Sequence, residues 1–327
     1  MNKIFKVIWN RTTQSLVVTS ELAKGQVKSS SDTHGESKSS LGKIFKLSAL
    51  SLLLLDVTST AYAAIPEGSI ARGVVQAVAI GGGSSTDAHG AVVVGAASRA
   101  TGGVKGIAIG HTVVANGQDA VAIGSNSNAQ TEAVAIGRLA NAAADGVAVG
   151  NEAKAVANST SLGNKAKSSS LGTIAIASGG KDTTATGNGA IAIGSEAVSN
   201  GNNAVALAAN ANATGKKAIA IGSDSKSLAE STLAIGNNAS ASAYTATALG
   251  TNAAASGQKA IAISAGPNST TATELAAIAI GSDSKALGNS SLAIGDSANA
   301  IQENAIAVGR NSNASNIGAT AIGNNAN

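Results

Sequence analysis

The chain repeats a short apolar phrase eighteen times between Val78 and Ile322: an aliphatic residue, usually Ala, another aliphatic residue, and then usually Gly. The segment from Ile219 to Gly222, Ile-Ala-Ile-Gly, is a typical copy. The closing positions follow one another mostly every 14 residues, with 13 or 15 in places and 17 twice. A fixed short period predicts one structural unit stacked many times, and therefore a quasi-one-dimensional solenoid.

Each apolar phrase has the pattern of a short strand that is buried on both sides. Side chains alternate along a strand, so Ile219 and Ile221 share one face and Ala220 takes the other. Both faces are apolar, as in strands covered on both sides. Gly222 is expected to end the strand in a sharp turn that requires either a positive φ or a close approach of two backbones.

A second alternation follows each closing residue. Positions three and five after it are small, as at Ser225 and Ser227, whereas positions two and four are often polar or charged, as at Asp224 and Lys226. This pattern predicts a strand with small side chains inside and polar ones in water. A second turn is expected about seven residues after the closing residue, for example near Gly215.

Two strands and two turns per unit predict an all-β fold, a parallel β-roll (β-solenoid) of about 14-residue repeats. Parallel neighbours lie ~4.8 Å apart, so eighteen coils make a rod roughly 85 Å long. One face of the apolar strand lines the interior, and the other would leave an apolar stripe larger than a soluble monomer tolerates. A closed symmetric assembly would bury it, although the sequence does not set the number of copies. The residues expected to pack in the core or between subunits are Ile107, Ile109, Val121, Ile123, Ile219, Ala220, Ile221, Leu233, Ile235, Ile278 and Ile280.

Composition separates an N-terminal segment from the repeats. Residues 1–63 hold 8 Lys and Arg against 4 Asp and Glu, whereas residues 64–327 hold 14 of each. A neutral repeat region argues against binding to nucleic acid or to an anionic membrane. Tyr244 is the only aromatic residue after residue 63, which excludes base-stacking platforms and predicts a thin core. The chain has no Cys, so disulfides and thiolate metal sites are excluded.

The N-terminal segment has the features of an export signal. A short, mostly apolar run from Leu47 to Leu55 follows Lys43 and Lys46, and the segment ends in the small-x-small pattern at residues 61–63. The run is too short for a stable transmembrane anchor. Cleavage is expected after Ala63.

The repeat Ala-Ile-Ala-Ile-Gly-x-x-Ala/Ser-x-Ala/Ser, over about residues 78–327, resembles the YadA-like head of trimeric autotransporter adhesins. The opening residues 1–10 resemble the extended signal peptide of very large proteins that Gram-negative bacteria secrete. The resemblance implies a left-handed parallel β-roll and a homotrimer on the outer membrane of a Gram-negative cell. Such heads bind host matrix proteins such as collagen, fibronectin or laminin, or other cells.

The resemblance also suggests a domain organisation. We expect an extended signal peptide at 1–63, an N-terminal lead-in at 64–77 and head repeats at 78–327. The stalk and C-terminal membrane anchor of the family have no counterpart in this sequence, so we expect attachment to the membrane only through an anchor outside it.

Two repeats are longer than the others. The spacing rises to 17 between Ala177 and Gly194 and between Ser264 and Gly281. Both long repeats carry the phrase Thr-Thr-Ala-Thr, 87 residues apart, which indicates a larger duplication. Extra residues in a solenoid bulge outward, often on the binding side, although drift after duplication, without any function, is the favoured explanation. The residues expected to face a ligand are Lys154, Asp224, Lys226, Thr183, Thr184, Thr270, Thr271, Asp283 and Lys285.

The repeats carry no set of residues typical of an enzyme. His89 and His111 have no ligand partners nearby in sequence, and no nucleophile, base and acid can be grouped, so we expect no catalysis, cofactor or metal. Two other functions stay open at this point. An ice-binding solenoid would need a flat file of Thr at one position per coil. A hexapeptide-repeat acyltransferase would need a period that is a multiple of six, which 14 is not.

Overall fold

The computed structural model describes residues 5–10, 15–20, 70–72 and 74–327, which fall into two compact units. The first unit contains an antiparallel hairpin of β1 (Phe5–Asn10) and β2 (Ser15–Ser20). The second contains the repeats. The apolar run at 47–55 and the expected cleavage site after Ala63 lie outside the described residues.

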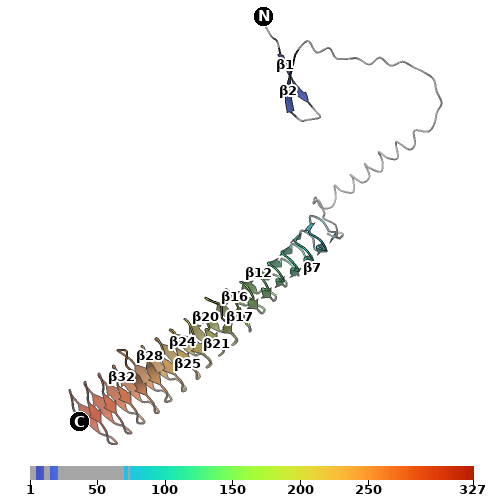
Figure 1. The fold of residues 1–327 in the computed structure, drawn as a ribbon. Coiled ribbons are helices and arrows are strands. Elements are labelled where there is room, and N and C mark those ends of the chain that lie inside the picture. The colour runs from blue at the N-terminus through green and yellow to red at the C-terminus, as the bar shows by residue number, and fades with distance from the viewer. Residues whose placement is uncertain (1–4, 11–14, 21–69, 73) are drawn as a thin grey trace, which may run out of the picture. The chain divides into compact units, whose positions relative to one another are not determined.

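The repeats form a roll with one parallel sheet on each side (Figure 1). The first, named here the apolar sheet, consists of eighteen strands, β4 (Val78–Ile80), β6 (Val92–Val94), β8 (Ile107–Ile109), β10 (Val121–Ile123), β12 (Val134–Ile136), β14 (Val147–Val149), β16 (Thr160–Leu162), β18 (Ile174–Ile176), β20 (Ile191–Ile193), β22 (Val205–Leu207), β24 (Ile219–Ile221), β26 (Leu233–Ile235), β28 (Thr247–Leu249), β30 (Ile261–Ile263), β32 (Ile278–Ile280), β34 (Leu292–Ile294), β36 (Ile306–Val308) and β38 (Thr320–Ile322).

The second, named here the polar sheet, lies across the narrow interior. Its strands are β3 (Ile70–Ala71), β5 (Ser85–Thr86), β7 (Arg99–Thr101), β9 (Val114–Asn116), β11 (Asn128–Ala129), β13 (Asn141–Ala142), β15 (Lys154–Ala155), β17 (Ala166–Ser168), β19 (Thr183–Ala185), β21 (Val198–Ser199), β23 (Asn212–Ala213), β25 (Lys226–Ser227), β27 (Ser240–Ala241), β29 (Ala253–Ala255), β31 (Thr270–Ala272), β33 (Lys285–Ala286), β35 (Asn299–Ala300) and β37 (Asn313–Ala314).

Every coil is in register with the next. In the apolar sheet, Ala220 pairs with Ala234 in parallel, and the aliphatic residues on either side pair with their equivalents. The turns continue the same ladder, since the backbone N–H of Gly222 donates to the carbonyl of Leu207 at 2.9 Å. The backbone of each coil is thus hydrogen-bonded to the backbone of the next coil. The predicted all-β solenoid is confirmed.

The interior of the roll is filled by methyl-sized side chains. The central alanines of the apolar strands are buried, and Ala220 is 0% exposed, as are Ser225 and Ser227 on the opposite side of the interior. Lys226, between these two serines, is exposed. The predicted small-in, polar-out pattern is confirmed for positions three to five, and the two sheets approach closely because only Ala, Ser and a few Thr or Val fill the space between them.

Position two after the closing residue belongs to a turn, which corrects the expected strand pattern. Asp224 has a φ of +58°, in the left-handed region that Asn and Asp tolerate best. The expectation for Gly222 is correct on both counts. Its φ is +122°, and a Cβ there would lie 2.5 Å from the carbonyl oxygen of Gly236. The residue at position two must therefore adopt a left-handed backbone conformation, and its side chain also faces water.

The two serines of one coil provide a matched test of the interior. The Oγ of Ser225 is buried without a hydrogen-bond partner, whereas the Oγ of Ser227 lies 2.7 Å from the Oγ1 of Thr232. We expect Ser225→Ala to stabilise the roll by about 1 kcal/mol, because it removes an unsatisfied buried hydroxyl. Ser227→Ala should destabilise it by about 1 kcal/mol, because Thr232 loses a partner. Hydrogen exchange of the backbone amides in this coil and its two neighbours measures both changes locally, and equal effects of the two substitutions would contradict the assigned hydrogen bonding.

The roll begins ahead of the first apolar phrase. β3 lies within the expected lead-in at 64–77 and pairs with β5, so the polar sheet starts there. The domain boundaries after residues 63 and 77 stay predictions. The additional residues of the two long repeats fall in the turn that precedes the polar sheet, at 178–182 and 265–269.

Candidate functional site

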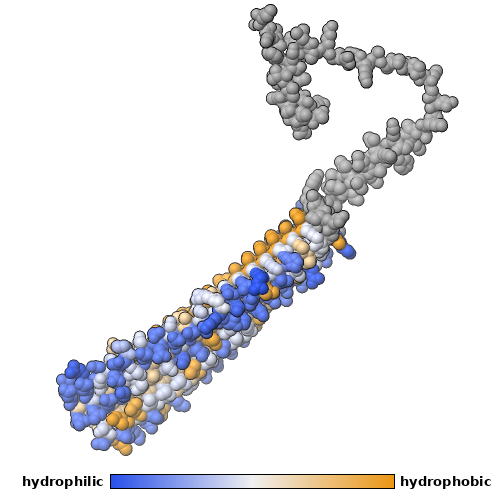
Figure 2. Space-filling view, viewed as in Figure 1, coloured by the Kyte–Doolittle hydropathy of each residue, from blue (hydrophilic) through white to orange (hydrophobic). Residues whose placement is uncertain are grey.

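The outer face of the apolar sheet is a continuous aliphatic ladder. Each of its eighteen strands places its first and third side chains outward, and all of these are Val, Ile or Leu except Thr160, Thr247 and Thr320. The side chains are only partly covered, and Ile109 and Ile235 are each 37% exposed. In Figure 2, hydrophobic surface follows one edge of the roll for much of its length. This apolar ladder is a surface that needs a partner.

The structure divides the residues expected to pack in the core or between subunits into two groups. Ala220 points into the roll and is fully buried. The others point outward on the apolar sheet and are half-buried or exposed: Ile107, Ile109, Val121, Ile123, Ile219, Ile221, Leu233, Ile235, Ile278 and Ile280. The sequence predicts the alternation of side chains along these strands correctly. It does not show which of the two faces points into the roll. The narrow interior has room only for small side chains, so the Ala face points inward.

The polar sheet presents stacked hydrophilic side chains to solvent. The turns that lead into this sheet are hydrogen-bonded to one another across coils, as between the Nδ2 of Asn238 and the Oδ1 of Asn252 at 2.9 Å. Lys226 and Asp224 are exposed, as expected. Asp283 and Lys285 are half-buried and form an ion pair of 3.3 Å with each other. The outer surface of this sheet is therefore a repetitive hydrogen-bonding surface.

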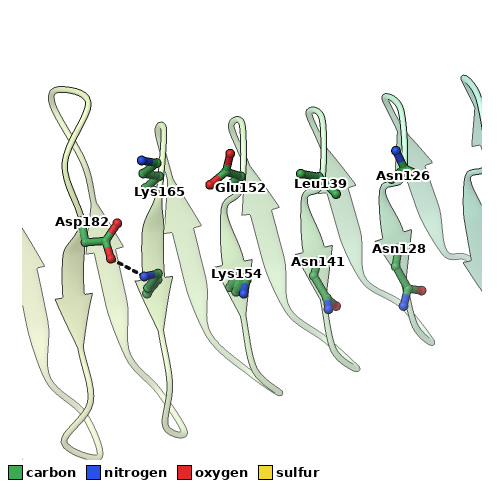
Figure 3. Close-up of a pocket in the computed structure, with 9 residues that line it drawn as sticks. Asn126, Asn128, Leu139, Asn141, Glu152, Lys154, Lys165 and Asp182 are labelled. Carbon is green, nitrogen blue, oxygen red and sulfur yellow. Dashed lines mark hydrogen bonds and ion pairs between the residues drawn. The ribbon is translucent and has the colours of Figure 1, made fainter.

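A shallow trough of about 650 Å³ crosses five neighbouring coils of the polar sheet. Figure 3 shows two rows of side chains along it, one on the turns and one on the strands. Lys167 forms an ion pair with Asp182, and Arg138, beside the trough, forms one of 3.0 Å with Glu152. The trough is lined by Asn126, Asn128, Leu139, Asn141, Glu152, Lys154, Lys165, Lys167 and Asp182. It brings the expected ligand-facing residue Lys154 together with lysines that the sequence did not single out.

The threonines of the long repeats correct the sequence interpretation. Thr183 and Thr270 are fully buried and donate to the carbonyl oxygens of Gly194 and Gly281, so they do not face a ligand. The Thr-Thr-Ala-Thr phrase starts a strand instead of forming the loop. Thr184 and Thr271 point outward and are half-buried. Counting back from the next apolar phrase, in place of counting forward across the insertion, would have placed them correctly.

Within the part of the chain that the structure describes, no three His, Cys, Asp or Glu side chains lie close enough to hold a metal ion together. His89 accepts a hydrogen bond of 3.1 Å from the backbone N–H of Val75, and His111 lies 2.8 Å from the hydroxyl of Thr112. Among the described residues, no helix is long and apolar enough to cross a membrane. The features that the structure does offer for function are therefore the apolar ladder and the polar surface.

Two family models match the chain. The extended signal peptide of the type V secretion system matches residues 1–50. The YadA head domain repeat matches residues 102–127, 115–137, 185–207, 213–239, 241–263, 272–298 and 300–326, which lie on both sides of an unmatched stretch at 138–184. The chain belongs to the trimeric autotransporter adhesins. No curated protein matches the adhesin.

The two matches agree with the structure. The head repeats of the adhesin coincide with the stacked coils, and the signal peptide precedes them in the chain. Together they direct the adhesin to export by type V secretion and to the outer-membrane surface of the cell. Heads of this family form trimers, bind host matrix and are typically non-catalytic.

Proposed function

We propose that the adhesin attaches a bacterium to host extracellular matrix or to cells by binding alone, without catalysis. In this proposal three copies of the roll associate through their apolar ladders and expose their polar sheets. The observation that carries the proposal is the division of the roll into one aliphatic and one hydrophilic outer face. Matrix proteins of the collagen, fibronectin or laminin type are the partners we expect.

The polar sheet supports binding through many weak contacts. Its outward residues repeat at equal height along the roll, and a trimer would present three such surfaces. Linked weak sites raise the overall affinity without any single strong site. An extended, repetitive partner would use this arrangement best, because several of its segments would be bound at once.

Removal of coils tests the proposal. Deleting residues 223–236 removes one coil and leaves the register of the remaining sheet intact. We expect solid-phase binding of the trimer to collagen, fibronectin or laminin to fall stepwise as one, two and three coils are deleted, because the sites are additive. A matched control, Lys226→Ala, should change binding little.

The inserted turns give the alternative outcome. If they hold the binding sites, shortening residues 178–182 and 265–269 to ordinary coil length would abolish binding while the circular dichroism spectrum stayed unchanged. If the intact trimer binds neither matrix proteins nor cells, the proposed function is wrong.

A further inference from the structure

The trough of the polar sheet contains lysines that no ion pair within the roll explains. Of the described ion pairs, none involves Lys154 or Lys165, whereas Glu152 and Asp182 are each held by another cation. Lys154 is the parallel neighbour of Lys167 one coil on. Like charges side by side on neighbouring strands oppose pairing. The fold alone therefore gives no reason for this arrangement.

The larger duplication supplies an internal comparison. Residues 165, 167, 181 and 182 are Lys, Lys, Lys and Asp, and their equivalents 87 residues later are Asn252, Ala254, Asn268 and Ser269. The backbone is the same in both copies: β17 and β19 correspond to β29 and β31, with equal lengths and the same pairing. In the second copy the long turn is tied to the preceding coil by a neutral bond of 2.6 Å from Asn252 to the carbonyl of Pro267. The long turn can thus be held without charge, and Lys165, which is in none of the described ion pairs, has no part in holding it.

The side chains of the trough indicate the chemistry of a ligand. The described lining contains three lysines against one Glu and one Asp, a net charge of only +1, too small to hold a polysulfated chain strongly. Asn126, Asn128 and Asn141 add amide groups, which donate and accept hydrogen bonds as peptide groups do. The neighbouring strands are already paired on both sides, so recognition must come from these side chains. Carboxylates spaced along a peptide would meet both the lysines and the amides.

We propose that this trough binds an extended acidic peptide segment of a protein partner, with its carboxylates on Lys154 and Lys165 and its backbone amides on the asparagines. The inference rests on the proposed adhesive function and assigns one site within it. The trough lies on the polar sheet, across the roll from the apolar ladder, so association of three chains through the ladder leaves it open. Each trimer would carry three such sites.

The test compares charge removal in the trough with charge removal elsewhere on the roll. Residues 64–327 are titrated by fluorescence anisotropy into a labelled peptide of alternating Glu and Ser, and into its Gln and Ser counterpart. The trough variant is Lys154→Gln and Lys165→Gln together. The matched control is Lys217→Gln and Lys259→Gln, two exposed lysines that lie outside the trough and are in none of the described ion pairs, so it removes equal charge further along the roll.

We expect the Glu peptide to bind and the Gln peptide not to bind. Affinity should fall about tenfold in the trough variant, the loss expected for two exposed charge pairs, and should be nearly unchanged in the control. Equal losses in both variants, or none in the trough variant, would overturn the inference. Binding of heparin in preference to the Glu peptide would overturn it in favour of a sulfated polysaccharide. Matrix binding without peptide binding refutes only this site, whereas peptide binding without matrix binding refutes only the proposed function.

Discussion

Replacing Ala220 with Asp should unfold the coils around it. Ala220 is 0% exposed and pairs with Ala206 and Ala234 on the neighbouring strands, so a carboxylate there would be buried among methyl groups. An uncompensated buried charge costs about 3–5 kcal/mol. The interior also lacks room for the larger side chain, because the sheets are separated by little more than alanine and serine side chains.

Hydrogen exchange is the appropriate measurement for this substitution, because long repeat arrays do not unfold in a single two-state step. We expect protection to be lost over about residues 205–236 and retained in distant coils. The control is Lys226→Asp, an exposed position on the neighbouring strand, which should change stability by less than about 0.5 kcal/mol. If both variants exchange alike, Ala220 does not face the interior.

Charging the apolar ladder should separate the subunits without unfolding them. Ile219 and Ile221 point outward, and their column already contains Thr247, so the roll itself tolerates polar residues there. In the double variant Ile219→Lys and Ile221→Lys, three pairs of lysines would meet in the proposed trimer. Burying unpaired charge of this kind should weaken association at least about a hundredfold.

Light scattering after size exclusion measures the result, and circular dichroism checks the fold. The matched control is Thr247→Ile, which adds an aliphatic side chain to the column and should leave association unchanged or tighter. A double variant that stays associated as the wild type does would show that the subunits meet through another face.

The sequence predicts the coil well because its period is set by local geometry. Fourteen residues hold two short strands and two turns, and the small residues at positions three and five report a narrow interior directly. The strand containing Ala220 was harder, because both of its faces are apolar. Which face turns inward depends on the distance between the sheets, a tertiary quantity. The outward direction of Ile221 therefore emerges only from the structure.

The candidate site shows the same limit. The place of Lys154 in the repeat predicts that it faces a ligand, but its grouping with Lys165 and Lys167 depends on one coil of 13 residues that stacks Lys154 in register with Lys167. Thr183 was misplaced because an insertion shifts any count made from the preceding phrase. Pairing with Ala166 on the neighbouring strand identifies its inward direction.

In the proposed adhesive head, the apolar ladder joins three rolls. Sedimentation equilibrium of residues 64–327 tests it most directly, by giving the mass of the particle in solution over a range of concentrations. We expect the mass of three chains, with the proportion of this species rising with concentration if association is weak. A folded, soluble monomer that persists at the highest concentrations would contradict it.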